Sequence, residues 1–196
     1  MMENNSMQDA PESLMGIIAD SETLGFDMPS EAKTGALLKT LVASKPRGKF
    51  LEIGTGTGLS TAWMLAGMDG QSTLCSVDND PEVQQIARNH LGQDSRVDFI
   101  CTDAELWLSN NQEQTFDIIF ADAWPGKFSR LDEALNLLAL GGIYFIDDLL
   151  PQANWPQGHA AKVPVLMEEI EHKDQFTSVR IAWASGLMLV TRIALP

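Results

Sequence analysis

The chain of 196 residues lacks several features that would assign it to common classes of protein. It contains no run of about 18 apolar residues, so no membrane-spanning helix is expected. Residues 1–13 are polar and acidic and lack the basic start and apolar centre of a secretion signal, which predicts a cytoplasmic protein. The two cysteines, Cys75 and Cys101, lie in apolar runs without metal-ligand spacing, so we interpret them as reduced core thiols.

Positive charge is also scarce. The chain has 13 Lys and Arg against 27 Asp and Glu, which gives a formal net charge of −14. An acidic surface repels phosphate backbones, and the basic residues are scattered, so nucleic acid is not expected as a partner. The length favours a single domain over residues 1–196, with a flexible tail over residues 1–12.

Strand-like and helical patterns alternate along most of the chain. Two helices are expected within residues 13–45, over 13–20 and 30–43, with Ser30 as the cap of the second. The elements that follow are strands over 49–53, 73–77, 97–101, 116–121, 143–146, 176–183 and 187–193, and helices over 59–68, 81–91, 104–110, 129–140 and 160–172. This order predicts an α/β protein with a doubly wound, mostly parallel sheet, helices on both faces and a C-terminal antiparallel hairpin.

A glycine-rich turn follows the first expected strand, in residues 50–61, FLEIGTGTGLST. Gly54, Gly56 and Gly58 would bring the backbone close to a ligand at the carboxyl end of that strand. The third glycine comes one residue earlier than in the G-x-G-x-x-G turn that holds a pyrophosphate. The acid before the glycines, Glu52, suits a cationic ligand, so we predict S-adenosylmethionine as the cofactor. A structural turn without a ligand is the alternative.

Acidic residues also end the second and third expected strands. Asp78 could accept hydrogen bonds from both ribose hydroxyls, whereas Asp80 precedes Pro81 and is better placed to cap the next helix. Asp103 and Ala104 follow the third strand, where an adenine could rest. Asp103 could equally cap the helix that begins after it.

Five segments in order resemble the motif series of class I S-adenosylmethionine-dependent methyltransferases: LEIGTGTGLST, SVDNDPE, CTDAE, FDIIFADA and GGIYFIDD. The series is most similar to that of the small cation-dependent O-methyltransferases, the group of caffeoyl-CoA and catechol O-methyltransferases. It covers roughly residues 28–193. The resemblance implies a Rossmann-like sheet of seven strands with the last antiparallel, methyl transfer to a hydroxyl of a small aromatic acceptor, and a homodimer as a possible assembly. The residues that we expect to contact the cofactor are Glu52, Gly54, Thr55, Gly56, Gly58, Ser60, Asp78, Asp103, Ala104 and Asp122.

The resemblance also implies a divalent cation, Mg, Mn or Ca, held by Asp122, Asp147 and Asp148 at the ends of two strands. Carboxylate oxygens are the ligands that these ions prefer, and the ion would lower the pKa of the acceptor hydroxyl. The family has Asp-Asn where this chain has Asp147-Asp148. The alternative is that Asp148 turns the chain while Asp122 faces only the cofactor.

The sequence motifs define the general base less clearly than they define the metal ligands. The family commonly places a Lys three residues after the first acid, where this chain has Pro125. Lys127 could enter the site from a remodelled turn, or it could be a solvated surface residue. The predicted catalytic residues are Asp122, Lys127 and His159.

The loop over residues 149–160 follows the two aspartates and is expected to carry acceptor specificity. Trp155 could stack on a planar acceptor, and Trp124 could form a wall of the pocket. His159 could be a base or a further ligand, or a helix-start residue with a satisfied ring.

Other functions fit the sequence less well. A nicotinamide-dependent oxidoreductase would need a hydride-transfer constellation such as Tyr-x-x-x-Lys, and the single tyrosine, Tyr144, lies in an apolar strand. A protein that binds S-adenosylmethionine without catalysis is the other alternative, because the family lysine is missing from its usual place. The N-P-P-[YF] signature of amino-group methyltransferases is absent.

Overall fold

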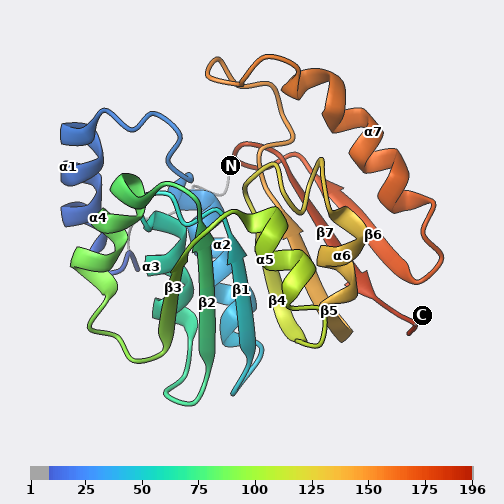
Figure 1. Ribbon diagram of the computed structural model, residues 1–196, viewed down its shortest axis with the longest axis horizontal. Coiled ribbons are helices and arrows are strands. Elements are labelled where there is room, and N and C mark those ends of the chain that lie inside the picture. The colour runs from blue at the N-terminus through green and yellow to red at the C-terminus, as the bar shows by residue number, and fades with distance from the viewer. Residues whose placement is uncertain (1–8, 196) are drawn as a thin grey trace.

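The computed structural model describes residues 9–195 of the chain, and within them seven strands form one sheet in the order β3-β2-β1-β4-β5-β7-β6 (Figure 1). The strands are β1 (Lys49–Ile53), β2 (Thr73–Asp78), β3 (Val97–Cys101), β4 (Phe116–Ala121), β5 (Leu138–Ile146), β6 (Phe176–Ile181) and β7 (Leu187–Arg192). Strands β1 to β5 pair in parallel, and β7 runs antiparallel to both β5 and β6. The predicted fold class, including the C-terminal antiparallel hairpin, is confirmed.

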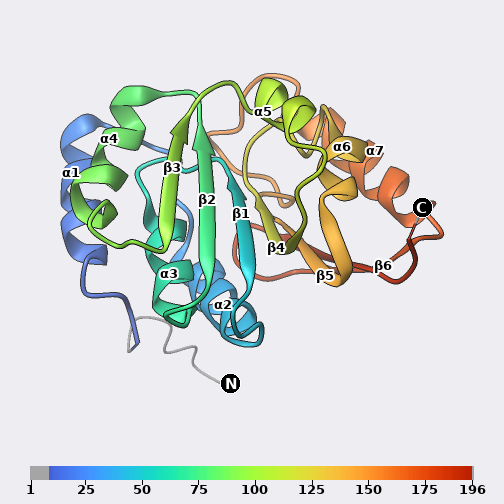
Figure 2. The ribbon, with the colours of Figure 1, turned by 60° about the horizontal axis from the view of Figure 1, so that its bottom comes forward.

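Two layers of helices cover the sheet. Helices α1 (Leu14–Leu24), α2 (Ala32–Ala43), α3 (Leu59–Gly67) and α4 (Pro81–Leu91) pack on one face, and α5 (Ala104–Asn110), α6 (Leu131–Asn136) and α7 (His159–Glu171) pack on the other. Figure 2 shows α5, α6 and α7 grouped on the side of the sheet away from α2 and α3. Neither face of the central strands is therefore exposed to solvent.

Alternating side chains of the central strands build the two halves of the core. Phe120 and Phe145 point to the layer of α1–α4, whereas Ile119, Tyr144 and Ile146 point to the layer of α5–α7. All five side chains are fully buried. Burial on both faces explains why these strands are continuous apolar runs in the sequence.

From β1 the chain adds β2 and then β3 on one side, and it then returns to add β4 on the other side of β1. Ile53, the last residue of β1, pairs with Val77 of β2 on one side and with Ala121 of β4 on the other. The chain leaves these neighbouring strand ends in opposite directions, which opens a crevice at their carboxyl ends. Every acidic residue singled out in the sequence as a site candidate lies at or beneath this edge or caps a helix beside it.

Some element boundaries differ from the predictions. The helix expected over 129–140 ends at Asn136, because Leu138 pairs with Phe116 and begins β5. Helix α1 extends beyond residue 20 to Leu24, where Gly25 adopts a positive φ of 76°. The N-cap of α2 is Glu31, so Ser30 is not the cap.

The tail predicted over residues 1–12 falls largely on residues 1–8, which lie outside the described residues. None of the helices within residues 9–195 combines the length and the apolar character that crossing a membrane requires.

Candidate functional site

A cavity of about 440 Å³ lies at the carboxyl ends of β1, β2, β4 and β5. Its lining comes from the glycine turn, the ends of these strands, the segment before α2, and the loop before α7. The cavity therefore gathers segments from almost the whole length of the chain. The lining residues used below are Ser30, Gly54, Gly56, Ser60, Asp78, Trp124, Asp122, Lys127, Asp147, Asp148, Trp155, His159 and Ser185.

The glycine turn depends on glycine for two separate reasons. A Cβ on Gly54, which has φ 102°, would lie 2.9 Å from the carbonyl oxygen of Asp122. Gly54 thus lets the ends of β1 and β4 approach each other. A Cβ on Gly58 would lie 2.7 Å from Cβ of Ala87 in α4, and Gly58 does not line the cavity. Gly58 therefore serves the packing of α3 against α4, and its contact with a cofactor stays a prediction from the sequence.

Asp78 is held at the cavity by backbone amides. Its Oδ2 accepts a hydrogen bond of 2.8 Å from the amide of Gly56, and its Oδ1 accepts one of 2.9 Å from the amide of Asp80. Asp80 caps α4 by accepting from the amides of Glu82 and Val83, as predicted. The division of roles between Asp78 and Asp80 therefore has a structural basis, and the ribose contact stays a prediction.

Glu52 lies beneath the glycine turn and does not line the cavity. It is fully buried, and its Oε2 accepts hydrogen bonds of 2.5 Å from the hydroxyls of Thr61 and Ser76. Its Oε1 has no hydrogen-bond partner among residues 9–195. Burial raises the pKa of Glu52 to about 7, against hydrogen bonds that lower it. Buried hydroxyls thus hold the carboxylate of Glu52 beneath the turn, and its contact with a cofactor stays a prediction from the sequence.

Asp103 and Ala104 also lie outside the lining of the cavity. Asp103 caps α5, with its Oδ1 accepting from the amides of Glu105 and Leu106 at 2.7 and 3.3 Å. The capping alternative for Asp103 thus agrees with the structure, and the cofactor contact of these two residues stays a prediction from the sequence.

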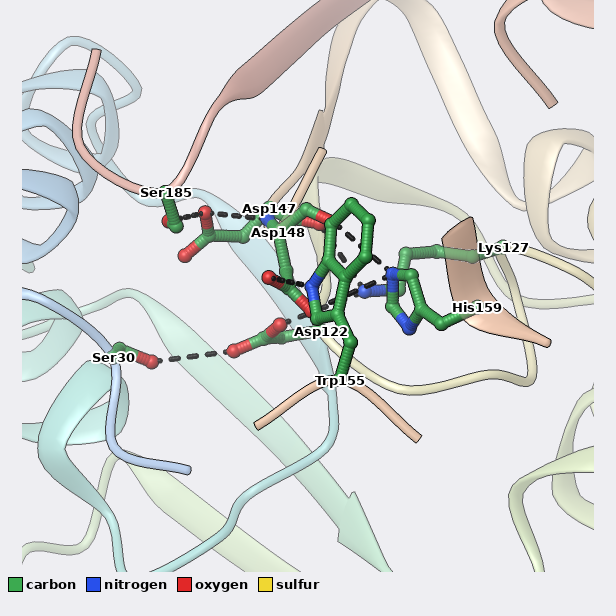
Figure 3. A network of polar contacts seen from close by, with 8 residues as sticks. All are labelled: Ser30, Asp122, Lys127, Asp147, Asp148, Trp155, His159 and Ser185. Carbon is green, nitrogen blue, oxygen red and sulfur yellow. Dashed lines mark hydrogen bonds and ion pairs between the residues drawn. The ribbon is translucent and has the colours of Figure 1, made fainter. Parts of the chain in front are cut away.

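The other end of the cavity holds a buried lysine among aspartates (Figure 3). The Nζ atom of Lys127 lies 3.6 Å from Oδ1 of Asp122 and donates a hydrogen bond of 3.1 Å to the carbonyl oxygen of Asp147. The side chain of Lys127 is only 2% exposed, whereas that of Asp122 is 20% exposed. The structure therefore rejects the surface alternative for Lys127.

Burial sets the protonation behaviour of this cluster. It raises the pKa of Asp122, and the charge of Lys127 offsets part of that effect. It raises the pKa of Asp147 to about 7, with repulsion from Asp122 adding to the shift. Both carboxyl groups therefore hold a proton more readily than an exposed aspartate does.

The turn over residues 124–129 explains how Lys127 reaches the site although it lies two positions beyond the place of the family lysine. Gly126 has φ 84°, and its amide donates to the carbonyl of Ser129 at 2.8 Å, while the amide of Lys127 donates to the carbonyl of Trp124 at 3.1 Å. The buried hydroxyl of Tyr144 donates to the carbonyl of Gly126 at 2.7 Å. This tight turn points the lysine inward, although it follows Asp122 by five residues rather than three.

Two serines in the site were not predicted from the sequence. Ser30 donates from its hydroxyl to Oδ2 of Asp122 at 3.3 Å, and Ser185, in the turn between β6 and β7, donates to Oδ1 of Asp147. Both contacts join residues far apart in sequence, so no local pattern could have indicated them.

An aromatic wall borders the acidic cluster. The rings of Trp155 and His159 are stacked, with centroids 4.4 Å apart and planes at 20°. The indole N–H of Trp155 donates to Oδ1 of Asp148 at 2.6 Å. The Nε2 atom of His159 lies 3.2 Å from the carbonyl oxygen of Asp148, whereas Nδ1 has no hydrogen-bond partner within the described part of the chain. Burial lowers the pKa of His159, which favours the neutral ring.

Comparison with known proteins identifies the family. Residues 51–149, half of the chain, match the family model of the methyltransferase domain. The chain belongs to this family. The matched segment contains the glycine turn, Asp78, Asp122, Lys127 and the Asp147-Asp148 pair. The family resemblance of the motif series is thereby confirmed, and the protein is an S-adenosylmethionine-dependent methyltransferase of class I.

Relatives and solved structures agree with this assignment. A protein of Mycobacterium sp. (strain KMS), named provisionally as an O-methyltransferase, is 29% identical over 189 residues, which cover 90% of this chain and 86% of that protein. The O-methyltransferase of Bacillus cereus, solved with SAH, has a TM-score of 0.79 at 19% identity and covers 98% of this chain and 93% of its own. TomG of Streptomyces achromogenes, an O-methyltransferase solved with SAM, has a TM-score of 0.78 at 20% identity, with coverages of 93% and 90%. The structural likeness shows that the methyltransferase shares their fold.

The three aspartates of the methyltransferase are not arranged as a metal site. Within residues 9–195 no group of three or more His, Cys, Asp or Glu side chains has an arrangement that could hold a metal ion. Asp148 has a positive φ of 66° and contacts Trp155, while Asp147 accepts from Ser185 and from the amide of Asp148. The Oδ1 atoms of Asp147 and Asp148 therefore serve hydrogen bonds within the protein.

Proposed function

We propose that this methyltransferase transfers the methyl group of S-adenosylmethionine to a hydroxyl of a small aromatic acceptor. The observation that carries the proposal is the composition of one cavity. The glycine turn and Asp78 line one part of it, and Asp122, Lys127 and the stacked pair of Trp155 and His159 line another. One cavity thus offers a place for a nucleoside, a proton acceptor and a flat apolar surface.

The cofactor end uses the backbone at Gly54 and Gly56 together with the carboxylate of Asp78. Because amides hold both oxygens of Asp78 in place, the carboxylate is oriented before a ribose arrives. Ser60 lines the cavity at the start of α3, where the methionine part of the cofactor would lie. The orientation of Asp78 supports its assignment to the ribose hydroxyls.

The acceptor end uses aromatic and acidic side chains. A planar ring can lie against the indole of Trp155, since stacked aromatic rings attract each other beyond their area of burial. Trp124, which is 39% exposed, stands at the edge of His159 with centroids 6.5 Å apart. The ring of His159, whose pKa is lowered by burial, backs the indole of Trp155 on the side away from the acceptor.

The transfer is an in-line displacement. The acceptor oxygen forms a bond to the methyl carbon as the carbon–sulfur bond breaks, and S-adenosylhomocysteine leaves. The hydroxyl proton passes to the carboxylate of Asp122, whose raised pKa brings it closer to that of a phenol and so eases the transfer. Lys127 is the charge partner of this group, and a protonated lysine beside the acceptor oxygen would favour the oxyanion.

The sequence also predicted a divalent cation, which would lower the pKa of the acceptor hydroxyl when bound. Asp122, Asp147 and Asp148 would be the residues that hold it. Their described arrangement does not fit such an ion, because the side chains of residues 9–195 form no group of three or more that could hold a metal, and the Oδ1 atoms of Asp147 and Asp148 accept hydrogen bonds from Ser185 and Trp155. The proposed transfer therefore includes no step through a metal ion, and cation dependence stays a prediction from the sequence.

Titration calorimetry with S-adenosylhomocysteine tests the cofactor part of the proposal, and micromolar binding is expected. Turnover is then measured as release of S-adenosylhomocysteine from S-adenosylmethionine with a panel of phenols and a matched panel of aliphatic alcohols. Turnover with phenols alone is expected. Absence of binding would contradict the cofactor site, and turnover confined to amines or aliphatic alcohols would contradict the acceptor class. From the sequence we also expect a single domain, a cytoplasmic location and a homodimer.

A further inference from the structure

Lys127 is a buried cation with unused hydrogen-bonding capacity. An ammonium group has three N–H donors, and Nζ of Lys127 makes one hydrogen bond among the described residues, to the carbonyl of Asp147. Its distance of 3.6 Å from Asp122 is that of an ion pair rather than of a direct hydrogen bond. Burying a lysine is costly unless its charge is compensated, and this lysine lines the cavity. Its remaining donors are therefore available to an oxygen of a bound acceptor.

We infer that the ammonium of Lys127 takes the place of a divalent cation in this methyltransferase. It holds the acceptor oxygen, stabilises the negative charge that forms when the proton leaves, and balances the charge of Asp122. The enzyme then needs no metal ion. This inference rests on the proposed function and names the group that activates the acceptor.

Charge balance in the cavity supports the inference. The cofactor brings a sulfonium, and Lys127 already supplies an ammonium near Asp122 and Asp147. A divalent ion would add two more positive charges within a few ångströms, and nearby like charges disfavour one another. The Oδ1 atoms of Asp147 and Asp148 already accept hydrogen bonds from Ser185 and Trp155, and Lys127 is the cation paired with Asp122.

The backbone around Lys127 is built to hold the cation in one place. A Cβ on Gly126 would lie 2.7 Å from the hydroxyl oxygen of Tyr144, so the turn packs directly on that side chain. The hydrogen bond from Tyr144 to the carbonyl of Gly126 is buried at both ends. A cation that must replace a metal ion needs such a fixed position, because stabilisation of a forming charge depends on preorganised donors.

The test combines metal binding with turnover. Electron paramagnetic resonance of added Mn²⁺, with the wild-type protein saturated with S-adenosylhomocysteine, is expected to show no ion bound at the site. Turnover with a phenol is expected to be the same in EDTA as in millimolar Mg²⁺. Lys127→Met is expected to lower kcat by about 100-fold, as loss of one oxyanion donor does, with cofactor affinity unchanged. Lys127→Arg, which keeps the charge, is expected to recover part of the loss.

The matched control is Lys173→Met, because Lys173 is also ion-paired, to Asp132 at 2.6 Å and Glu169 at 3.4 Å, but does not line the cavity. Its turnover is expected to equal that of the wild type. Loss of turnover in EDTA with recovery in Mg²⁺, or Mn²⁺ binding that Asp147→Asn removes, would overturn the inference even if Lys127→Met fails to fold. Failure of S-adenosylhomocysteine to bind would instead overturn the proposed function, so the two failures are distinguishable.

Discussion

The hydroxyl of Tyr144 donates a hydrogen bond of 2.7 Å to the carbonyl of Gly126, and this contact holds the turn that carries Lys127 into the cavity. Tyr144 lies near the carboxyl end of β5 and is fully buried. One core residue thus connects the packing of the sheet to the position of a site residue.

Tyr144→Phe removes this hydrogen bond and leaves the carbonyl of Gly126 without its donor. An unsatisfied buried carbonyl costs about 1–3 kcal/mol, so the free energy of unfolding in urea should fall by that amount. Turnover should fall as well, because Lys127 is no longer held in place, while calorimetry should show wild-type affinity for S-adenosylhomocysteine. Unchanged turnover at the lower stability would show that the turn keeps its shape without Tyr144.

Asp78→Ala should weaken binding of S-adenosylhomocysteine by about tenfold or more, since a hydrogen bond to a charged group contributes about 1.5–3 kcal/mol. The matched control is Asp103→Ala, because Asp103 caps α5 and lies outside the lining of the cavity. That control should lose about 1 kcal/mol of stability with cofactor affinity unchanged. Equal loss of affinity in both variants would return Asp103 to the cofactor site.

The raised pKa of Glu52 predicts that the stability of the protein depends on pH. Its folded pKa of about 7 lies above the ordinary value of 4.5, so the folded protein keeps a proton that the unfolded chain has released. Stability from this group is present below about pH 4.5 and is lost as the pH rises through about 7, by about 3 kcal/mol in all. Glu52→Gln does not titrate, so its stability relative to the wild type should rise between these pH values. Melting curves measured from pH 5 to pH 8 check this, and a constant difference would contradict the raised pKa.

Trp155→Leu removes the indole that stacks on His159 and donates to Asp148. The KM for a phenolic acceptor should rise by about tenfold, because loss of aromatic stacking costs about 0.5–1.5 kcal/mol beyond the lost area of contact. Trp155→Phe keeps a ring and should recover most of the affinity. Neither variant should change the affinity for S-adenosylhomocysteine in calorimetry, and a change in both variants would place Trp155 at the cofactor instead.

Ser30→Ala removes the hydroxyl that donates to Asp122 at 3.3 Å. The remaining carboxylate is less well compensated, so its pKa should rise and the acidic limb of the kcat profile should move to higher pH. The full profile of turnover against pH is the measurement. A profile that matches the wild type would show that Ser30 does not tune the proposed base.

Local features of this protein could be read from the sequence alone. The bounds of β1, α4, β3, α5 and β4 agree with the predicted ranges, because short apolar runs, helical spacing and turn or capping residues encode them over a few positions. The cap at Asp80 was equally predictable, since its donors lie two and three residues away. The order of the motifs indicated the family.

Only the tertiary structure decided which candidates share the cavity. It placed Glu52 beneath the glycine turn and Asp103 at a helix cap, and it brought Ser30 to Asp122 across 92 positions. It also brought Lys127 inward through a contact with Tyr144 that spans 18 positions from Gly126. Sequence patterns report the preferences of neighbouring residues, whereas these positions follow from packing between strands and turns that are far apart in the chain.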